Sequence, residues 1–175
     1  MATANRYHSN YHARVITGKI EELFPEIVSW GEAEWWPKDS LMSFSREVSG
    51  PVVEGTEYIQ KVKLPFGPSW RTVVSEIKNN ESITRKFKEG FFEGCETISI
   101  KPLCCHNVKI EYEMLFRIKG LINRILWKVI FRRLHDRNIE YILGNLKAYA
   151  EKAPQGCRSG FEKILENFKV HMERR

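Results

Sequence analysis

One abrupt change of periodicity near the end of the chain constrains its fold more than any other feature. Residues 107–119 read NVKIEYEMLFRIK, in which apolar and polar residues alternate apart from Leu115. Such alternation predicts a β-strand with one face on a core and the other in water. After Gly120 the period becomes helical, and no proline interrupts residues 121–152. The sequence therefore predicts a long helix directly after a half-buried strand.

The predicted helix is too apolar for an ordinary surface helix. At 1.5 Å of rise per residue it would span about 45 Å. Arg124, Lys128 and Arg132 form a narrow basic stripe, whereas apolar residues fill much of the remaining surface in the first half. Trp127, Ile130 and Leu134 lie broadly opposite that stripe. An apolar surface this wide indicates that the helix has more than one partner to cover it.

Six further segments upstream have strand-like alternation and are separated by turn residues. They cover residues 11–17, 41–49, 54–64, 70–78, 82–92 and 96–103. Turn chemistry about every ten residues favours an antiparallel, up-and-down sheet. Between the first two segments, residues 18–24 predict a short helix, and residues 26–37 predict a second short helix or an irregular segment. The fold class is therefore α+β.

The last residues form a separate unit in the sequence. Apolar residues recur at helical spacing in the tail, at Phe161, Ile164, Leu165, Phe168 and Met172. This spacing predicts a short amphipathic helix that needs a surface to dock on. We expect one domain over residues 1–153 and a helical extension over 154–175, in a monomer or a dimer.

Composition restricts the partners and the compartment. The 175 residues are 42% hydrophobic and 29% charged, as in a soluble globular protein. The net charge is +6, but the basic residues are spread along the chain and interleaved with glutamates. We therefore expect no nucleic-acid partner. Residues 1–14 contain no apolar leader, which favours a cytoplasmic protein.

Neither the cysteines nor the histidines indicate a metal centre. Cys104, Cys105 and His106 lack the paired spacing of zinc sites, although Cys95 is near in sequence. His8 and His12 share a strand face with Asn10 and Arg14, which reads as a wet face. No phosphate-cradling glycine loop or dinucleotide motif occurs. We expect no metal and no cofactor.

The order of elements resembles the helix-grip fold of the SRPBCC superfamily, which includes START-like and polyketide-cyclase-like proteins. The resemblance covers about residues 8–152. It rests on that order and on two stretches, VITGKIEELFPEIVSWGEAEWWP (15–37) and EGFFEGCETISIKP (89–102), the second followed by NVKIEYEMLF. It implies a curved seven-stranded antiparallel sheet wrapped around the long helix, with an elongated cavity between them.

The strand alternation then predicts which side chains line that cavity. They are Phe44, Arg46, Tyr58, Gln60, Val62, Phe87, Phe91, Tyr112, Met114, Phe116, Trp127, Ile130 and Leu134. Arg46 and Gln60 would either orient a polar group of a ligand or bond to a neighbour. Arg46, Glu89 and Tyr112 are the candidate catalytic groups, with Arg85 beside Glu89. Ordinary solvated strand charges are the competing interpretation of Glu89.

Three functions remain open at this point. The first is binding or transport of a hydrophobic small molecule, such as a lipid, isoprenoid, quinone or polyketide, in the internal cavity. The second is an enzyme similar to polyketide cyclases and dehydratases that uses the same cavity. The third is an interaction protein whose basic stripe and C-terminal helix dock on an anionic membrane or a protein partner.

Overall fold

The computed structural model describes residues 7–65 and 67–151, so the predicted C-terminal helix and the predicted domain boundary lie outside the described residues. The strands are β1 (His8–Thr17), β2 (Met42–Ser45), β3 (Glu57–Val62), β4 (Ser69–Lys78), β5 (Ser82–Glu89), β6 (Phe92–Pro102) and β7 (Asn107–Ile118). The helices are α1 (Ile20–Val28), α2 (Leu121–Leu126), the π-helical turn η1 (Trp127–Phe131) and α3 (Arg132–Ala150).

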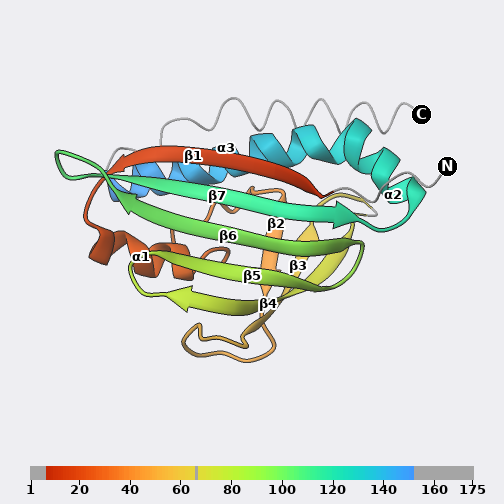
Figure 1. Cartoon of the computed structure of the whole chain (residues 1–175), viewed down its shortest axis with the longest axis horizontal. Helices are drawn as coiled ribbons and strands as arrows, with labels where there is room; N and C mark the ends of the chain where they lie inside the picture. Colours follow the sequence, from red (N-terminus) through yellow and green to blue (C-terminus); the bar gives the residue numbers. More distant parts are fainter. Residues whose placement is uncertain (1–6, 66, 152–175) are drawn as a thin grey trace.

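The strands form one antiparallel sheet in the order β1-β7-β6-β5-β4-β3-β2. Six strands follow one another as a meander, and β1 closes the sheet beside the last of them. Figure 1 shows a curved sheet, with the long helix running along it close to β1. The predicted helix-grip architecture is confirmed.

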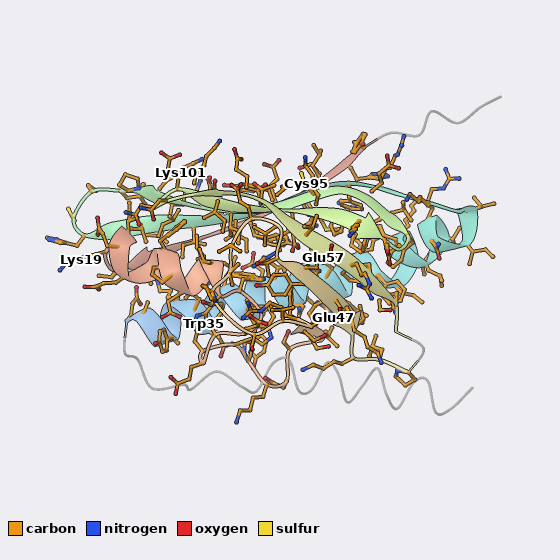
Figure 2. All side chains as sticks on the ribbon, turned by 90° about the horizontal axis from the view of Figure 1, so that it is seen from below. Lys19, Trp35, Glu47, Glu57, Cys95 and Lys101 are labelled. Atoms are coloured by element: carbon orange, nitrogen blue, oxygen red, sulfur yellow. The ribbon has the colours of Figure 1, made fainter. Side chains whose placement is uncertain are left out.

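The alternation of β7 decides which face of the sheet carries the core. Its even-numbered residues from Val108 to Ile118 are buried against the helices, while Leu115 points outward and is 44% exposed. Figure 2 shows the two layers from the side, with Lys101 on the outer face of the sheet and Trp35 on the inner side. The core therefore lies between the concave face of the sheet and the helices.

The long C-terminal helix contains a π-helical turn. η1 separates α2 from α3 and buries Trp127, whereas α2 itself has no buried residue. A π turn inserts an extra residue and rotates the helix face that follows. Because of this rotation, α3 presents Leu134, Ile139, Ile142, Leu143 and Leu146 to the core.

Between β1 and β2 the structure has one helix, α1, and the second segment predicted there, residues 26–37, is irregular beyond the end of α1. α1 continues through Pro25, and residues 29–36 form turns instead of a second helix. Gly31 has a φ of +95°, which ends helical geometry there, and a Cβ on it would lie 2.3 Å from the Phe44 ring. These turns place Trp30 and Trp35 in the core at 1% and 3% exposure. Burial of two indoles favours this arrangement over a second helix.

No helix within the described ranges combines the length and the apolar character needed to cross a lipid bilayer.

Candidate functional site

Side chains fill most of the space between the sheet and the long helix, which corrects the expectation of an elongated cavity. The described residues leave an inner void of about 10 Å³ and an outer void of about 30 Å³ in this space. A single water needs roughly 10–15 Å³ measured in this way. Indole and phenyl rings occupy the rest, packed edge to face around Phe92, Trp70, Phe116 and Trp127.

The two voids are neighbours that share part of their walls. Met42, Trp70 and His135 line both of them. The outer void lies under the start of α3 and is almost entirely apolar, whereas Gln60 and Glu96 contribute polar groups to the inner void. Met42, with three rotatable bonds, is the most flexible of these three side chains.

A buried polar network centred on Glu96 forms one wall of the inner void. Gln60 Nε2 donates to Glu96 Oε1 at 2.8 Å, and the Tyr112 hydroxyl donates to Glu96 Oε2 at 3.1 Å. Trp70 Nε1 donates to Gln60 Oε1 at 2.9 Å. Arg85 Nη1 lies 3.6 Å from Glu96 Oε1, with these two side chains 1% and 4% exposed. A charged pair this deeply buried is tolerable only because each charge faces the other.

The guanidinium of Arg85 is incompletely satisfied. Its Nη2 donates to the Val28 carbonyl at 3.4 Å, but among the described residues Nε and Nη1 have no hydrogen-bond partner. The Tyr58 hydroxyl is likewise buried without one, and the Arg85 guanidinium stacks 5.1 Å from the Tyr58 ring centroid. Burial raises the pKa of Tyr58, and it raises the pKa of Tyr112 well above its ordinary value. Both phenols therefore keep their protons, and Tyr112 uses its proton to bind Glu96.

Most of the predicted cavity residues point into the core. Phe44, Gln60, Phe87, Tyr112 and Met114 line the inner void, and Val62, Phe91, Trp127 and Leu134 line the outer void. Tyr58 and Phe116 are buried beside the voids, and Ile130 packs against Leu41 and Leu134.

Two of the three candidate catalytic groups lie away from these voids. Arg46 pairs with Glu32 at 2.8 Å and lines an open groove of about 620 Å³ between residues 45–57 and β4. Glu89 is 64% exposed and lies 3.4 Å from Arg71. Only Tyr112, of these three, contacts the inner void. The solvated-charge interpretation therefore describes Glu89.

The expectation of a wet face on β1 is wrong, because α3 covers it. Asn10 Nδ2 donates to Asp136 Oδ1 at 2.5 Å, and His12 Nδ1 lies 2.8 Å from Glu140 Oε1. Arg14 Nη2 also binds the Glu140 carboxylate, at 2.7 Å. Several buried polar atoms at this interface nevertheless have no hydrogen-bond partner among the described residues, including His12 Nε2 and His135 Nδ1.

Glu96 and His135 are the site residues that the sequence analysis does not name, and Arg85, expected beside Glu89, pairs with Glu96 instead. Arg85 and Glu96 are register partners on β5 and β6. Opposite charges placed opposite each other on the two strands were the available signal. His135 gave none, because its helical position does not show which strand it meets.

A second surface of interest lies at the start of the long helix, in α2 and η1 directly after β7. Five apolar residues are exposed there, namely Leu121, Ile122, Ile125, Leu126 and Val129. Residues 114–135 contain no acidic residue, but they contain the basic residues Arg117, Lys119, Arg124, Lys128, Arg132 and Arg133. We call this surface the basic apolar helix end; in Figure 1 it lies around α2, at the opposite end of the molecule from α1.

No family model matches this sequence, and no curated protein matches it either. Solved structures do resemble it. Norcoclaurine synthase from Thalictrum flavum, in complex with dopamine and hydroxybenzaldehyde, aligns at a TM-score of 0.62 and 12% identity over 89% of this chain and 95% of that one. A START superfamily protein from Mycobacterium smegmatis aligns at 0.58 and 12%, covering 84% and 99% of the two chains.

A protein from Thermus thermophilus aligns at a TM-score of 0.64 and 14% identity, over 85% of this chain and all 100% of that one. At these identities the likeness concerns the fold. The chain shares the fold of these structures, the helix-grip fold that its order of elements suggested.

Proposed function

We propose that this protein binds a small hydrophobic molecule that carries at least one hydrogen-bond acceptor. The observation that carries the proposal is the inner void, whose aromatic walls meet the buried polar groups of Gln60, Glu96 and Tyr112. Arg85 lies behind Glu96, outside the lining of the void, and has unpartnered N–H groups among the described residues. A buried unsatisfied donor costs about 1–3 kcal/mol. A carbonyl, phenol or carboxylate oxygen that reached Arg85 from the void would remove that cost, and apolar burial of the remaining molecule would supply the affinity.

The size of the voids sets a condition on this proposal. Pockets for drug-sized ligands occupy about 300–1,000 Å³. The inner and outer voids are far smaller, so a ligand must displace side chains as it enters. Met42 lines both voids and has three rotatable bonds, so we expect its side chain to move when a ligand enters. The fold relative that was solved with dopamine and hydroxybenzaldehyde supports a small aromatic guest of this kind.

A fluorescence titration with 1-anilinonaphthalene-8-sulfonate tests the proposal, because this probe joins aromatic rings to an acceptor group. We expect saturable binding at one site. Met42→Trp should weaken it by about tenfold or more, equivalent to roughly 1.4 kcal/mol, since the larger ring closes the path between the voids. Leu115→Trp, on the outer face at 44% exposure, is the matched control.

The proposal fails if the probe does not saturate, or if Met42→Trp and Leu115→Trp bind it equally well. Thermal melting of both variants checks that each is folded. Met42→Phe provides a smaller obstruction if the tryptophan variant does not fold.

We propose a second function for the basic apolar helix end, namely docking on an anionic membrane surface. Exposed apolar residues beside basic ones are typical of helices that lie in the membrane interface. Lys128, Arg132 and Arg133 have no ion-pair partner in the described part of the chain. Each basic residue near an anionic leaflet contributes about 1 kcal/mol. An anionic lipid surface therefore complements both the charge and the apolar character of this surface.

Vesicle flotation tests the membrane proposal with the full chain. Binding should occur with vesicles of phosphatidylcholine and phosphatidylserine, should weaken in salt, and should be lost on pure phosphatidylcholine. Ile122→Glu should abolish it, whereas Val48→Glu, which replaces a residue 77% exposed between β2 and β3, should leave it intact. Flotation that ignores lipid charge, or no flotation at all, contradicts the proposal. In the second case a protein partner or the C-terminal segment is the remaining occupant.

A further inference from the structure

Three side chains with metal-ligating atoms meet between β1 and α3. His12 comes from β1, and His135 and Asp136 are the fourth and fifth residues of α3. One nitrogen of each histidine and one oxygen of Asp136 all lie within 4.8 Å of one another. Each imidazole is only 10% exposed, whereas the Asp136 carboxylate is 37% exposed. The cluster is therefore shielded on the core side and reachable from solvent through Asp136.

The outer contact of His12 determines which of its nitrogens carries the proton. His12 Nδ1 lies 2.8 Å from Oε1 of Glu140, and a carboxylate accepts hydrogen bonds without donating them. Nδ1 therefore holds the proton. In the neutral ring Nε2 then carries no proton and offers a lone pair, and this nitrogen lies 3.5 Å from Asp136 Oδ1. Two acceptors face each other with no donor between them.

The same reasoning applies to His135 through Tyr112. The Tyr112 hydroxyl donates to the Glu96 carboxylate at 3.1 Å, since a carboxylate only accepts hydrogen bonds. Its oxygen therefore accepts from His135 Nε2, which is 3.4 Å away. This leaves the lone pair of His135 Nδ1 facing Asp136 Oδ1 at 3.9 Å.

The two nitrogens that face Asp136 make no hydrogen bond to any other described residue. Within the described ranges, His12 Nε2 and His135 Nδ1 are buried atoms without a hydrogen-bond partner. Asn10 Nδ2 donates to Asp136 Oδ1 but to neither nitrogen, so the two nitrogen lone pairs and this carboxylate oxygen converge with no donor between them and repel one another. A cation between them converts this repulsion into attraction.

We propose that His12, His135 and Asp136 form a binding site for a divalent transition-metal ion of the zinc class. Ligands about 2.0–2.1 Å from a tetrahedral zinc ion lie roughly 3.4 Å apart. The two distances to Asp136 Oδ1, 3.5 Å and 3.9 Å, are close to that edge. Two imidazoles and one carboxylate leave a fourth position for water or another ligand.

The groups around the cluster have the arrangement that metal sites require. Metal-bound histidines normally bond through their second nitrogen to a carboxylate or another acceptor, which fixes the ring and the tautomer. Glu140 does this for His12, and the Tyr112 oxygen does it for His135. His135 also lines both interior voids, so a bound ion would hold one wall of the ligand space in place.

Titration of the full-length, reduced protein with Co²⁺ tests the site without any assay of activity. We expect one ion per chain, with the visible absorption bands of a tetrahedral nitrogen and oxygen site. His12→Gln and Asp136→Asn each remove a ligand and should weaken binding by more than the roughly 10–100-fold expected for Glu140→Gln, which removes only an outer contact. His8→Gln, on the same strand but exposed, is the matched control and should bind like the wild type.

Three results overturn the proposal. One is the absence of visible bands at micromolar Co²⁺ together with imidazolium ¹⁵N signals for His12 or His135 at neutral pH, since a proton then does the work assigned to the metal. Another is binding that His12→Gln and Asp136→Asn leave unchanged. The last is a cobalt–thiolate band, which would assign the ion to Cys104 and Cys105 in the β6–β7 turn. If His12→Gln does not fold, Asp136→Asn carries the test because its side chain is partly exposed.

Discussion

Replacing Glu96 by glutamine would leave the positive charge of Arg85 buried without a counter-charge. Arg85 is 1% exposed and its Nη1 lies 3.6 Å from Glu96 Oε1. Glutamine retains the shape of the side chain but can accept through only one of the two atoms that bind Gln60 and Tyr112. Removing one partner of a buried ion pair costs about 3–5 kcal/mol.

Urea unfolding measures this cost directly. With a slope of about 2 kcal/mol per molar urea, the midpoint of Glu96→Gln should fall by roughly 1.5–2.5 M. Glu93→Gln is the matched control on the same strand. It breaks the pair with Arg117, in which the side chains are 37% and 30% exposed. Exposed pairs contribute about 0.2–1 kcal/mol, so its midpoint should shift by less than about 0.5 M.

A double variant separates the charge effect from a packing effect. Arg85→Met combined with Glu96→Gln removes both charges, and apolar replacement of a buried ion pair is often neutral or stabilising. Its midpoint should therefore lie above that of Glu96→Gln alone. The reasoning is refuted if Glu96→Gln loses no more stability than Glu93→Gln, or if the double variant is no more stable than the single one.

Two further predictions concern the outer face of the sheet. Hydrogen bonds from Lys101 and Lys109 lower the pKa of Glu111 to about 2, against an ordinary 4.5. The ionised carboxylate therefore stabilises the folded state above about pH 4.5, and this contribution is lost as the pH falls towards 2; Glu111→Gln should flatten the stability profile across that window, and profiles that stay parallel would count against it. Gly94→Ala would place a Cβ 2.1 Å from the Leu115 carbonyl oxygen at a φ of +127°, so it should lower the melting temperature more than Gly55→Ala, whose φ of +91° meets no atom within 4 Å. Equal melting temperatures for the two alanine variants would show that the close approach is relieved without cost.

Much of the fold was predictable because it depends on local periodicity. The period of two in residues 107–119 identified the buried face of β7, and the change at Gly120 located the start of the long helix. Of the two alternatives for residues 26–37, the structure has the irregular one after Val28. Gly31 adopts a positive φ there, and the tryptophans around it gain more from burial in the core than from a helical turn.

The candidate sites were less predictable because each depends on a neighbour that is distant in sequence. Gln60 was expected to point inward and does so, but Glu96, Arg85 and Trp70 decide what it binds. His12 was read as solvent-facing because its own strand offers only polar neighbours on that face. The helix that covers it lies more than a hundred residues later in the chain.

The sequence by itself therefore determined the order of the strands and the long helix, the buried face of β7 and the excess of basic residues at the start of the long helix. Each of these can be read from residues that are close together in the sequence, because strands repeat every two residues, helices repeat about every 3.6 residues, and charge belongs to each residue type. Only the tertiary structure decided that aromatic rings fill the expected cavity, that a buried ion pair borders it, and that two histidines and an aspartate share one point in space. Those outcomes depend on strand register, on the rotation introduced by the π turn and on packing volume, which arise only when separate elements come together.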